Sequence, residues 1–158
     1  MHEKWFDSAH HKWMKEALKE AKKAFKKNEV PIGAVVVHQE KIVGRGHNKT
    51  ESLPDATAHA EMIALRQATR KLKRWRLSGC TLYTTVEPCV MCTGATVLSR
   101  LDRLVFAVSD LKGGACGSLY NIAQDTRLNH QIEIVSGILK EEASNLLKQF
   151  FKQLRRKR

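Results

Sequence analysis

Long apolar runs, proline-rich linkers and internal repeats are all missing from this sequence, and each absence excludes a class of protein. No stretch approaches the roughly 20 consecutive apolar residues that a membrane span requires, so no membrane association is expected. The chain has 158 residues and only three prolines, with no low-complexity segment between its parts. A chain of this length without a linker is typical of one domain, so residues 1–158 are expected to fold as a single unit.

Cysteine is also scarce. Two of the four cysteines form a Cys-x-x-Cys pair, which leaves too few for the disulfide framework of a small secreted domain. Residues 1–7 carry charged side chains where a signal peptide would have an apolar run. Both observations predict a reducing, cytoplasmic compartment.

Acidic residues are few relative to basic ones: 16 Asp and Glu stand against 28 Lys and Arg, for a formal net charge of +12. An enzyme acting on a small metabolite does not need this excess. A polyphosphate partner does, because each phosphate contact releases counterions and so strengthens binding. Charge runs are often only the solvated faces of helices, and for the first two clusters that reading stays open. The basic residues form three clusters: Lys12, Lys15, Lys19, Lys22, Lys23, Lys26 and Lys27; Arg66, Arg70, Lys71, Lys73, Arg74 and Arg76; and Lys148, Lys152, Arg155, Arg156, Lys157 and Arg158.

One motif carries chemistry. His59 lies two residues before Glu61, and Cys89 and Cys92 follow in a Pro-Cys-x-x-Cys string. One imidazole and two thiolates are zinc ligands, and three protein ligands leave a coordination position for water, as in catalytic sites. Bound zinc lowers the pKa of such a water toward neutrality, and a neighbouring carboxylate can carry its protons. The motif therefore predicts a hydrolytic zinc site with Glu61 as a non-ligand.

Two other interpretations of the cysteines remain open at this point. The Cys-x-x-Cys pair could be a redox pair, although such motifs come without an upstream His-x-Glu. A closed structural zinc site could borrow Cys80 or Cys116 as a fourth ligand. Cys80 opens an apolar strand and Cys116 lies in a glycine-rich stretch, which favours reading both as small apolar side chains. The remaining histidines have no ligand-like spacing and are predicted at the surface or as caps: His2, His10, His11, His38, His47 and His130.

Hydrophobic periodicity places these residues in an α/β fold. Helices are predicted over 8–27, from about His59 to 72, from about Cys89 to 100, and after Gly137, where an apolar stripe ending at Leu154 favours the core. Asp55 is read as the start of the second helix and Pro88 as the first position of the third. Strands are predicted over 31–37 and 41–46, joined as a hairpin, and over 80–86, 103–108 and 131–135. The alternation predicts a mixed sheet with helices on both faces.

The chain resembles the cytidine deaminase-like superfamily and, within it, the bacterial tRNA-specific adenosine deaminases. The zinc motif is common to the superfamily, whereas the strings around Pro31 and Asp110 look like the tRNA enzymes. Asn28 and Ala56 depart from the family's usual glycine and proline. The resemblance covers nearly the whole chain and is carried by residues 29–36, 46–48, 55–61, 88–92 and 109–118. It implies a three-layer α/β/α fold with five strands in the order 2-1-3-4-5, and a homodimer.

The resemblance also implies roles for individual residues. One zinc ion per chain would be held by His59, Cys89 and Cys92, with Glu61 as the catalytic proton shuttle. Asn48 would hydrogen-bond the target base, since its amide both donates and accepts. Asp110 and Lys112 would lie near the nucleotides that flank the target. The expected reaction is hydrolytic deamination of adenosine to inosine at the wobble position of a tRNA anticodon stem-loop.

Two rival functions remain open. The chain could deaminate a free base, nucleoside or nucleotide. Such a small substrate would not require the net charge of +12. It could also be an RNA-binding module with a structural zinc ion, which leaves Glu61 unexplained.

Overall fold

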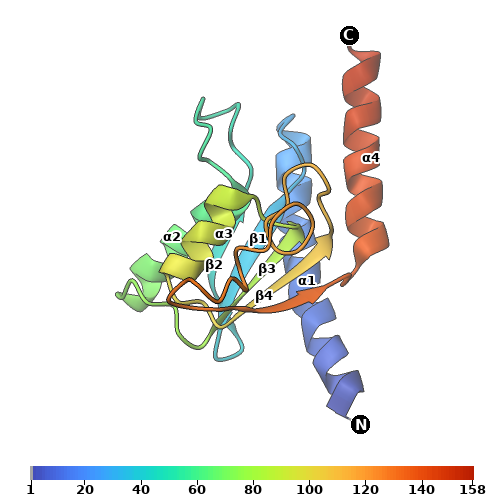
Figure 1. The fold of residues 1–158 in the computed structure, drawn as a ribbon. Helices are drawn as coiled ribbons and strands as arrows, with labels where there is room; N and C mark the ends of the chain where they lie inside the picture. The colour runs from blue at the N-terminus through green and yellow to red at the C-terminus, as the bar shows by residue number, and fades with distance from the viewer. Residues whose placement is uncertain (1) are drawn as a thin grey trace.

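The computed structural model describes residues 2–158, with side-chain burial and contacts described from residue 7 onward. Five strands form one sheet in the order β2-β1-β3-β4-β5 (Figure 1). β1 pairs antiparallel with β2 and β3, while β3, β4 and β5 run parallel. This order confirms the fold expected from the resemblance. The strands are β1 (Gly33–His38), β2 (Lys41–His47), β3 (Cys80–Val86), β4 (Arg103–Val108) and β5 (Glu133–Ser136).

Helices cover both faces of the sheet (Figure 1). Alternation along β1 decides which side chains meet which layer, because successive residues of a strand point to opposite faces. Ala34 and Val36 point to one face of the sheet and belong to the core cluster formed with α2 (Ala60–Leu72) and α3 (Val90–Leu98). Val35 and Val37 pack with α1 (His2–Lys26) and with the start of α4 (Lys140–Arg156). The result is the predicted three-layer arrangement.

Glycines bring α2 unusually close to the sheet. A Cβ atom at Gly46 would lie 2.3 Å from the carbonyl oxygen of Ala60, and one at Gly44 would lie 2.1 Å from that of Ala64. Real side chains do not tolerate such distances, so β2 can touch the backbone of α2 only with glycine at these two positions. This contact fixes the first turn of α2, which directly follows the candidate metal ligand His59.

The hairpin is confirmed, with Gln39 and Glu40 at φ 48° and 57° in its turn. Two positive φ values match the right-handed twist of the paired strands. Asn28, at φ 58°, ends the turn after α1 in the same conformation. Asparagine adopts it more readily than most residues, which explains how Asn28 can stand where the family usually has glycine.

Other predictions were wrong. α1 begins at His2 instead of Ser8, and no proline or glycine interrupts residues 2–7. The apolar stripe of α4 is only partly buried: Phe150 lies against Phe25, whereas Leu154 is exposed, because the helix extends beyond the sheet (Figure 1). His10 and His47 are buried and not at the surface. The side chain of His2 lies outside the described residues. No helix within residues 2–158 combines the length and apolarity needed to cross a membrane.

Candidate active site

His59 is the residue that caps the N-terminus of α2. Its backbone is extended, with φ −79° and ψ 150°, and the helix begins at Ala60. The prediction that Asp55 starts this helix was wrong: the Asp55 carboxylate instead accepts the backbone N–H and the hydroxyl of Thr57, which closes a separate turn. The cap position resolves a geometric difficulty. Residues two apart on a helix point in different directions, whereas His59 stands outside the helix and Glu61 lies within its first turn.

Cys89 has the same place at the start of α3. It is the N-cap residue, with φ −73° and ψ 178°, so Pro88 precedes the cap and is not the first helical residue as predicted. Cys92 lies three residues later, on the first turn, where side chains share a face with the cap. Both sulfurs are therefore near the positive end of the α3 dipole, which stabilises negative charge.

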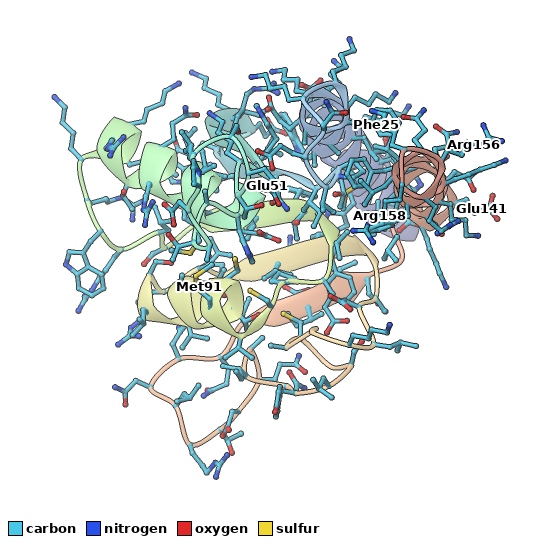
Figure 2. The ribbon with its side chains drawn as sticks, turned by 90° about the horizontal axis from the view of Figure 1, so that it is seen from above. Phe25, Glu51, Met91, Glu141, Arg156 and Arg158 are labelled. Atoms are coloured by element: carbon cyan, nitrogen blue, oxygen red, sulfur yellow. The ribbon has the colours of Figure 1, made fainter. Side chains whose placement is uncertain are left out.

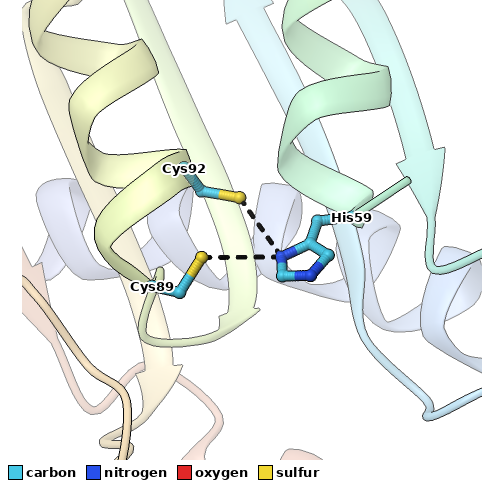
Figure 3. Close-up of side chains that lie close together, drawn as sticks. All are labelled: His59, Cys89 and Cys92. Carbon is cyan, nitrogen blue, oxygen red and sulfur yellow. Dashed lines mark hydrogen bonds between the residues drawn. The ribbon is translucent and has the colours of Figure 1, made fainter. Parts of the chain in front are cut away.

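The two helix starts face each other across the site (Figure 3). His59 Nδ1 lies 3.5 Å from Cys89 Sγ and 3.5 Å from Cys92 Sγ. All three donor atoms lie within 4.8 Å of one another, and among the described residues these three side chains form the candidate metal cluster. His59 and Cys89 are half-buried and Cys92 is buried.

The charges within the cluster are unequal. The hydrogen bond from Cys92, together with that from His59, lowers the pKa of Cys89 to about 4 despite partial burial. The same contact with Cys89 and burial raise the pKa of Cys92. The Cys89 hydrogen bond also raises the pKa of His59. Cys89 is thus a thiolate at neutral pH, the form that binds metal, and Cys92 holds a proton that a metal would displace.

Glu61 is buried beside this cluster, with 4% of its surface exposed. Its Oε1 accepts a hydrogen bond from the Thr84 hydroxyl at 3.2 Å, and its Oε2 accepts one from Cys92 Sγ at 3.4 Å. Burial raises the pKa of Glu61 above the ordinary value of a carboxyl group. A carboxyl group so shifted exchanges protons closer to neutral pH, which suits general acid–base catalysis.

Asn48 lies at the end of β2, against the start of α2. Its Oδ1 accepts the backbone N–H of Ala60 at 2.9 Å, and the side chain is buried. Because that N–H can only donate, the contact fixes which end of the amide is oxygen. The Asn48 NH₂ group therefore points away from Ala60. Asn48 therefore lies against the start of α2, next to His59, and its side-chain oxygen already accepts a hydrogen bond.

Asp110 and Lys112 lie in the loop after β4. Asp110 Oδ1 accepts the backbone N–H groups of Lys112 and Gly113 at 3.0 and 3.2 Å. The carboxylate therefore shapes its own loop. The Lys112 side chain is exposed. This loop reaches the metal cluster through its backbone, since the Ala115 N–H donates to the carbonyl of Pro88 at 2.9 Å.

Cys80 and Cys116 are apart from the cluster. Cys80 is buried in the apolar core on the α2 side, and burial raises the pKa of its thiol. Cys116 is buried in the same core, with its Sγ 3.3 Å from the Thr93 hydroxyl, and burial raises its pKa to about 12. Neither thiol belongs to the three-residue cluster of the described residues, so the geometry favours an open site.

Comparison with known proteins gives the family. A model of the MafB19-like deaminase family matches residues 8–155. A tRNA-specific adenosine deaminase of Bacillus subtilis is 53% identical over 146 residues, covering 92% of this chain and 91% of that protein. Another, of Aquifex aeolicus, is 48% identical over 143 residues, covering 90% of this chain and 94% of that protein. The chain belongs to the tRNA-specific adenosine deaminase family.

Solved structures agree with this assignment. A structure from a study of A-to-I editing by tRNA:A34 deaminases at the wobble position is 40% identical, with a TM-score of 0.80, and covers 85% of this chain and 98% of that one. A guanine deaminase from Nitrosomonas europaea is 25% identical, with a TM-score of 0.77, over 89% of this chain and 83% of that one. The fold is therefore shared with a guanine deaminase, whereas the higher identity lies with the tRNA enzymes.

This member of the tRNA-specific adenosine deaminase family also contains buried carboxylates that the sequence did not predict. Glu29 and Glu87 are 1% and 3% exposed, and Glu20 is 3% exposed and pairs with His47. Periodicity cannot reveal them, because each is buried by contacts with distant segments. One signal was present: Glu87 comes directly after an apolar strand and directly before Pro88 and Cys89.

Proposed function

We propose that this chain is a hydrolase that deaminates adenosine to inosine at the wobble position of a tRNA anticodon. The observation that carries the proposal is the cluster of one imidazole and two thiols beside a buried carboxyl group, in a chain 53% identical to a tRNA-specific adenosine deaminase. Thiol ligands need a reducing environment and tRNA is the substrate, so the cytoplasm is the proposed compartment.

Zinc is the metal that fits the cluster, at one ion per chain. In a tetrahedral site with bonds of about 2.3 Å to sulfur and about 2.05 Å to nitrogen, a nitrogen and a sulfur ligand lie about 3.6 Å apart. The two separations of 3.5 Å between His59 Nδ1 and the sulfurs match this value. A bound zinc ion would supply Lewis acidity that brings the pKa of a water molecule toward neutrality. His59, Cys89 and Cys92 would hold it and leave one position open.

Glu61 would carry the protons of the reaction. It is close enough to the cluster to touch Cys92, and its Oε1 is oriented by the Thr84 hydroxyl. Glu61 would take a proton from the attacking water, give it to the ring of adenine, and assist the departure of ammonia. Its raised pKa allows it to hold that proton between the two transfers.

The substrate contacts would come from both sides of the cluster. The NH₂ group of Asn48 would donate to the edge of the target base. Lys112, exposed on the loop that Asp110 shapes, would contact the phosphates of flanking nucleotides. The anticodon loop suits such a site because its bases are single-stranded and turn out of the stack at low cost.

The basic C-terminal end would extend the contact with tRNA. Arg155–Arg158 are all exposed. The end of α4 and the loop between β2 and α2 lie at the same end of the molecule (Figure 1). Seen from above, Arg158 lies on the side of α4 toward Glu51 of that loop (Figure 2). Positive charge there would meet the backbone of the anticodon stem while its loop occupies the site.

A homodimer would be formed through α3. Val90, Gly94 and Leu98 recur every four residues, so they share one face of the helix. Val90 and Leu98 are 49% and 71% exposed, and a Cβ atom at Gly94 would have no neighbour within 4 Å. An open apolar face with a small residue at its centre allows the close approach of a second copy. Leu98→Glu should convert a dimer to a monomer in sedimentation analysis, with Leu53→Glu, also exposed, as control.

The direct test of the reaction is Glu61→Gln. The amide keeps the shape of Glu61 and cannot shuttle protons, so inosine formation in tRNA should fall by at least about 10²–10⁴-fold. Zinc content, measured by atomic emission, should remain one per chain. Near-wild-type turnover in the zinc-loaded variant would remove Glu61 from the mechanism.

A further inference from the structure

Two buried carboxylates, Glu29 and Glu87, have no part in the chemistry described above. Glu29 follows the C-terminus of α1, and Glu87 follows the end of β3. They come from distant parts of the chain, yet their surroundings are alike. Each accepts hydrogen bonds from backbone N–H groups of a loop and from one serine hydroxyl of the same loop.

Glu29 binds the loop between β2 and α2. Its carboxylate accepts the backbone N–H of Glu51 at 3.0 Å, that of Ser52 at 2.8 Å, and the Ser52 hydroxyl at 2.6 Å. Burial acts to raise the pKa of Glu29, but the hydrogen bonds of Ser52 and Glu51 outweigh it and lower the pKa. The loop follows Asn48 directly, and its base is closed by the Lys49 N–H on the carbonyl of Ala58, next to His59.

Glu87 binds the loop between β4 and β5 in the same way. Its carboxylate accepts the backbone N–H groups of Asp110, Cys116 and Ser118 at 3.2, 3.0 and 3.1 Å, and also the Ser118 hydroxyl. The loop is built around the carboxylate: a Cβ atom at Gly114 would lie 2.3 Å from Glu87 Cδ. The loop that is held in this way carries both proposed substrate contacts after β4.

The hydrogen bonds described above for each carboxylate all come from its loop. A buried charge without hydrogen bonds is strongly unfavourable, whereas charge-assisted hydrogen bonds are stronger than neutral ones. Each loop is therefore held in one conformation by a group that belongs to the rigid part of the fold. Loops ordered before binding do not have to be ordered by the substrate, which improves its affinity.

We propose that Glu29 and Glu87 are positioning residues, which hold the 49–55 and 109–118 loops in the conformation that receives RNA. The first loop closes on Ala58, next to His59, and the second contacts Pro88, next to Cys89. The proposal rests on the proposed function for the identity of the substrate. It predicts an effect on substrate binding that is separate from the chemical step. It also predicts that each carboxylate orders its own loop and not the other.

The test compares four variants with two controls. Glu29→Gln and Glu87→Gln replace one of the two carboxylate oxygens with an NH₂ group, which cannot accept from the backbone N–H that it then faces. Ser52→Ala and Ser118→Ala remove one side-chain hydrogen bond each. Glu141→Gln and Ser78→Ala change exposed residues of the same types. Hydrogen exchange is followed by mass spectrometry. Exchange in residues 49–55 should be faster in Glu29→Gln and Ser52→Ala, and exchange in residues 109–118 should be faster in Glu87→Gln and Ser118→Ala. The controls should change neither loop.

Kinetics on an anticodon stem-loop complete the test. We expect KM to rise about tenfold for the glutamine variants and about threefold for the alanine variants, with kcat and zinc content unchanged. Unchanged exchange in both loops, unchanged KM, a fall in kcat alone, or loss of zinc would each overturn the proposal. If a glutamine variant does not fold, the serine variants decide. Failure of the wild-type protein to deaminate RNA would overturn the proposed function instead, and the exchange pattern would still report the anchoring of the loops.

Discussion

The affinity of the site for zinc should increase with pH, because the ligands must lose protons to bind. Cys89, with a pKa of about 4, is already a thiolate across the neutral range. Cys92 has a raised pKa and therefore keeps its proton there. Zinc binding must displace this proton, so the association constant should rise about tenfold per pH unit, equivalent to about 1.4 kcal/mol.

The pKa of His59 adds a second step. It is raised above its ordinary value of 6.5, and below that raised pKa the imidazole also has to lose a proton. The slope of log affinity against pH should then steepen from about 1 toward about 2 as the pH falls. Competition with a chromophoric chelator between about pH 6 and about pH 8.5 measures this slope, and calorimetry in buffers of different ionisation enthalpy counts the protons released.

Two variants separate the ligands from the other thiols. Cys92→Ser should lower zinc affinity and reduce the slope, because the displaced thiol proton is gone. Cys116→Ser should leave both unchanged, since its thiol contacts Thr93 and lies outside the three-residue cluster. A flat pH dependence in the wild-type protein, or loss of zinc in Cys116→Ser, would refute this assignment of protons and ligands.

Three further predictions concern other parts of the molecule. Thr84→Val removes the hydrogen bond that orients Glu61 Oε1; kcat should fall about tenfold with zinc content retained, and an unchanged kcat would show that Thr84 has no such role. A Cβ atom at Gly46 would lie 2.3 Å from the Ala60 carbonyl oxygen, so Gly46→Val forces β2 away from the first turn of α2. Thermal unfolding should show that the free energy of unfolding falls by about 1–3 kcal/mol or more. Wild-type stability would contradict the close packing. Deleting Arg155–Arg158, all exposed, should reduce the slope of log tRNA affinity against log salt by about 0.7–0.9 for each phosphate that the tail neutralises. The melting temperature should not change. An unchanged slope would indicate that the lysines of α1, and not the tail, contact the phosphates.

The sequence predicted the parts of the fold that depend on local pattern. The β-branched strand over 80–86 and the strand over 103–108 have the predicted bounds, and the Gln39–Glu40 turn joins the hairpin as expected. The close identity to tRNA-specific adenosine deaminases confirmed the resemblance. The three metal-ligand candidates came from their residue types and spacing alone, and the structure brings their side chains together.

The predictions failed where the outcome depends on distant contacts. Asp55 and Pro88 look like helix starts in sequence, but His59 and Cys89 occupy the cap positions. At α2 a side chain from another element contributes, since Asn48 Oδ1 accepts the backbone N–H of the first helical residue, Ala60. The apolar stripe of α4 could not reveal that the sheet ends before the helix does. A carboxylate such as Glu87 reads as polar and exposed, and only the loop that returns to it explains its burial.

The most direct measurement is a substrate comparison with the zinc-loaded wild-type protein. An intact tRNA with adenosine at the wobble position, its anticodon stem-loop, free adenosine and free guanine would be incubated separately, and inosine, xanthine and ammonia quantified by mass spectrometry and an ammonia assay. Deamination of adenosine to inosine at the wobble position of both RNAs, with no turnover of guanine or free adenosine, is the predicted result. Turnover of guanine, or of free adenosine at a rate equal to that of the RNA, would contradict the proposed function.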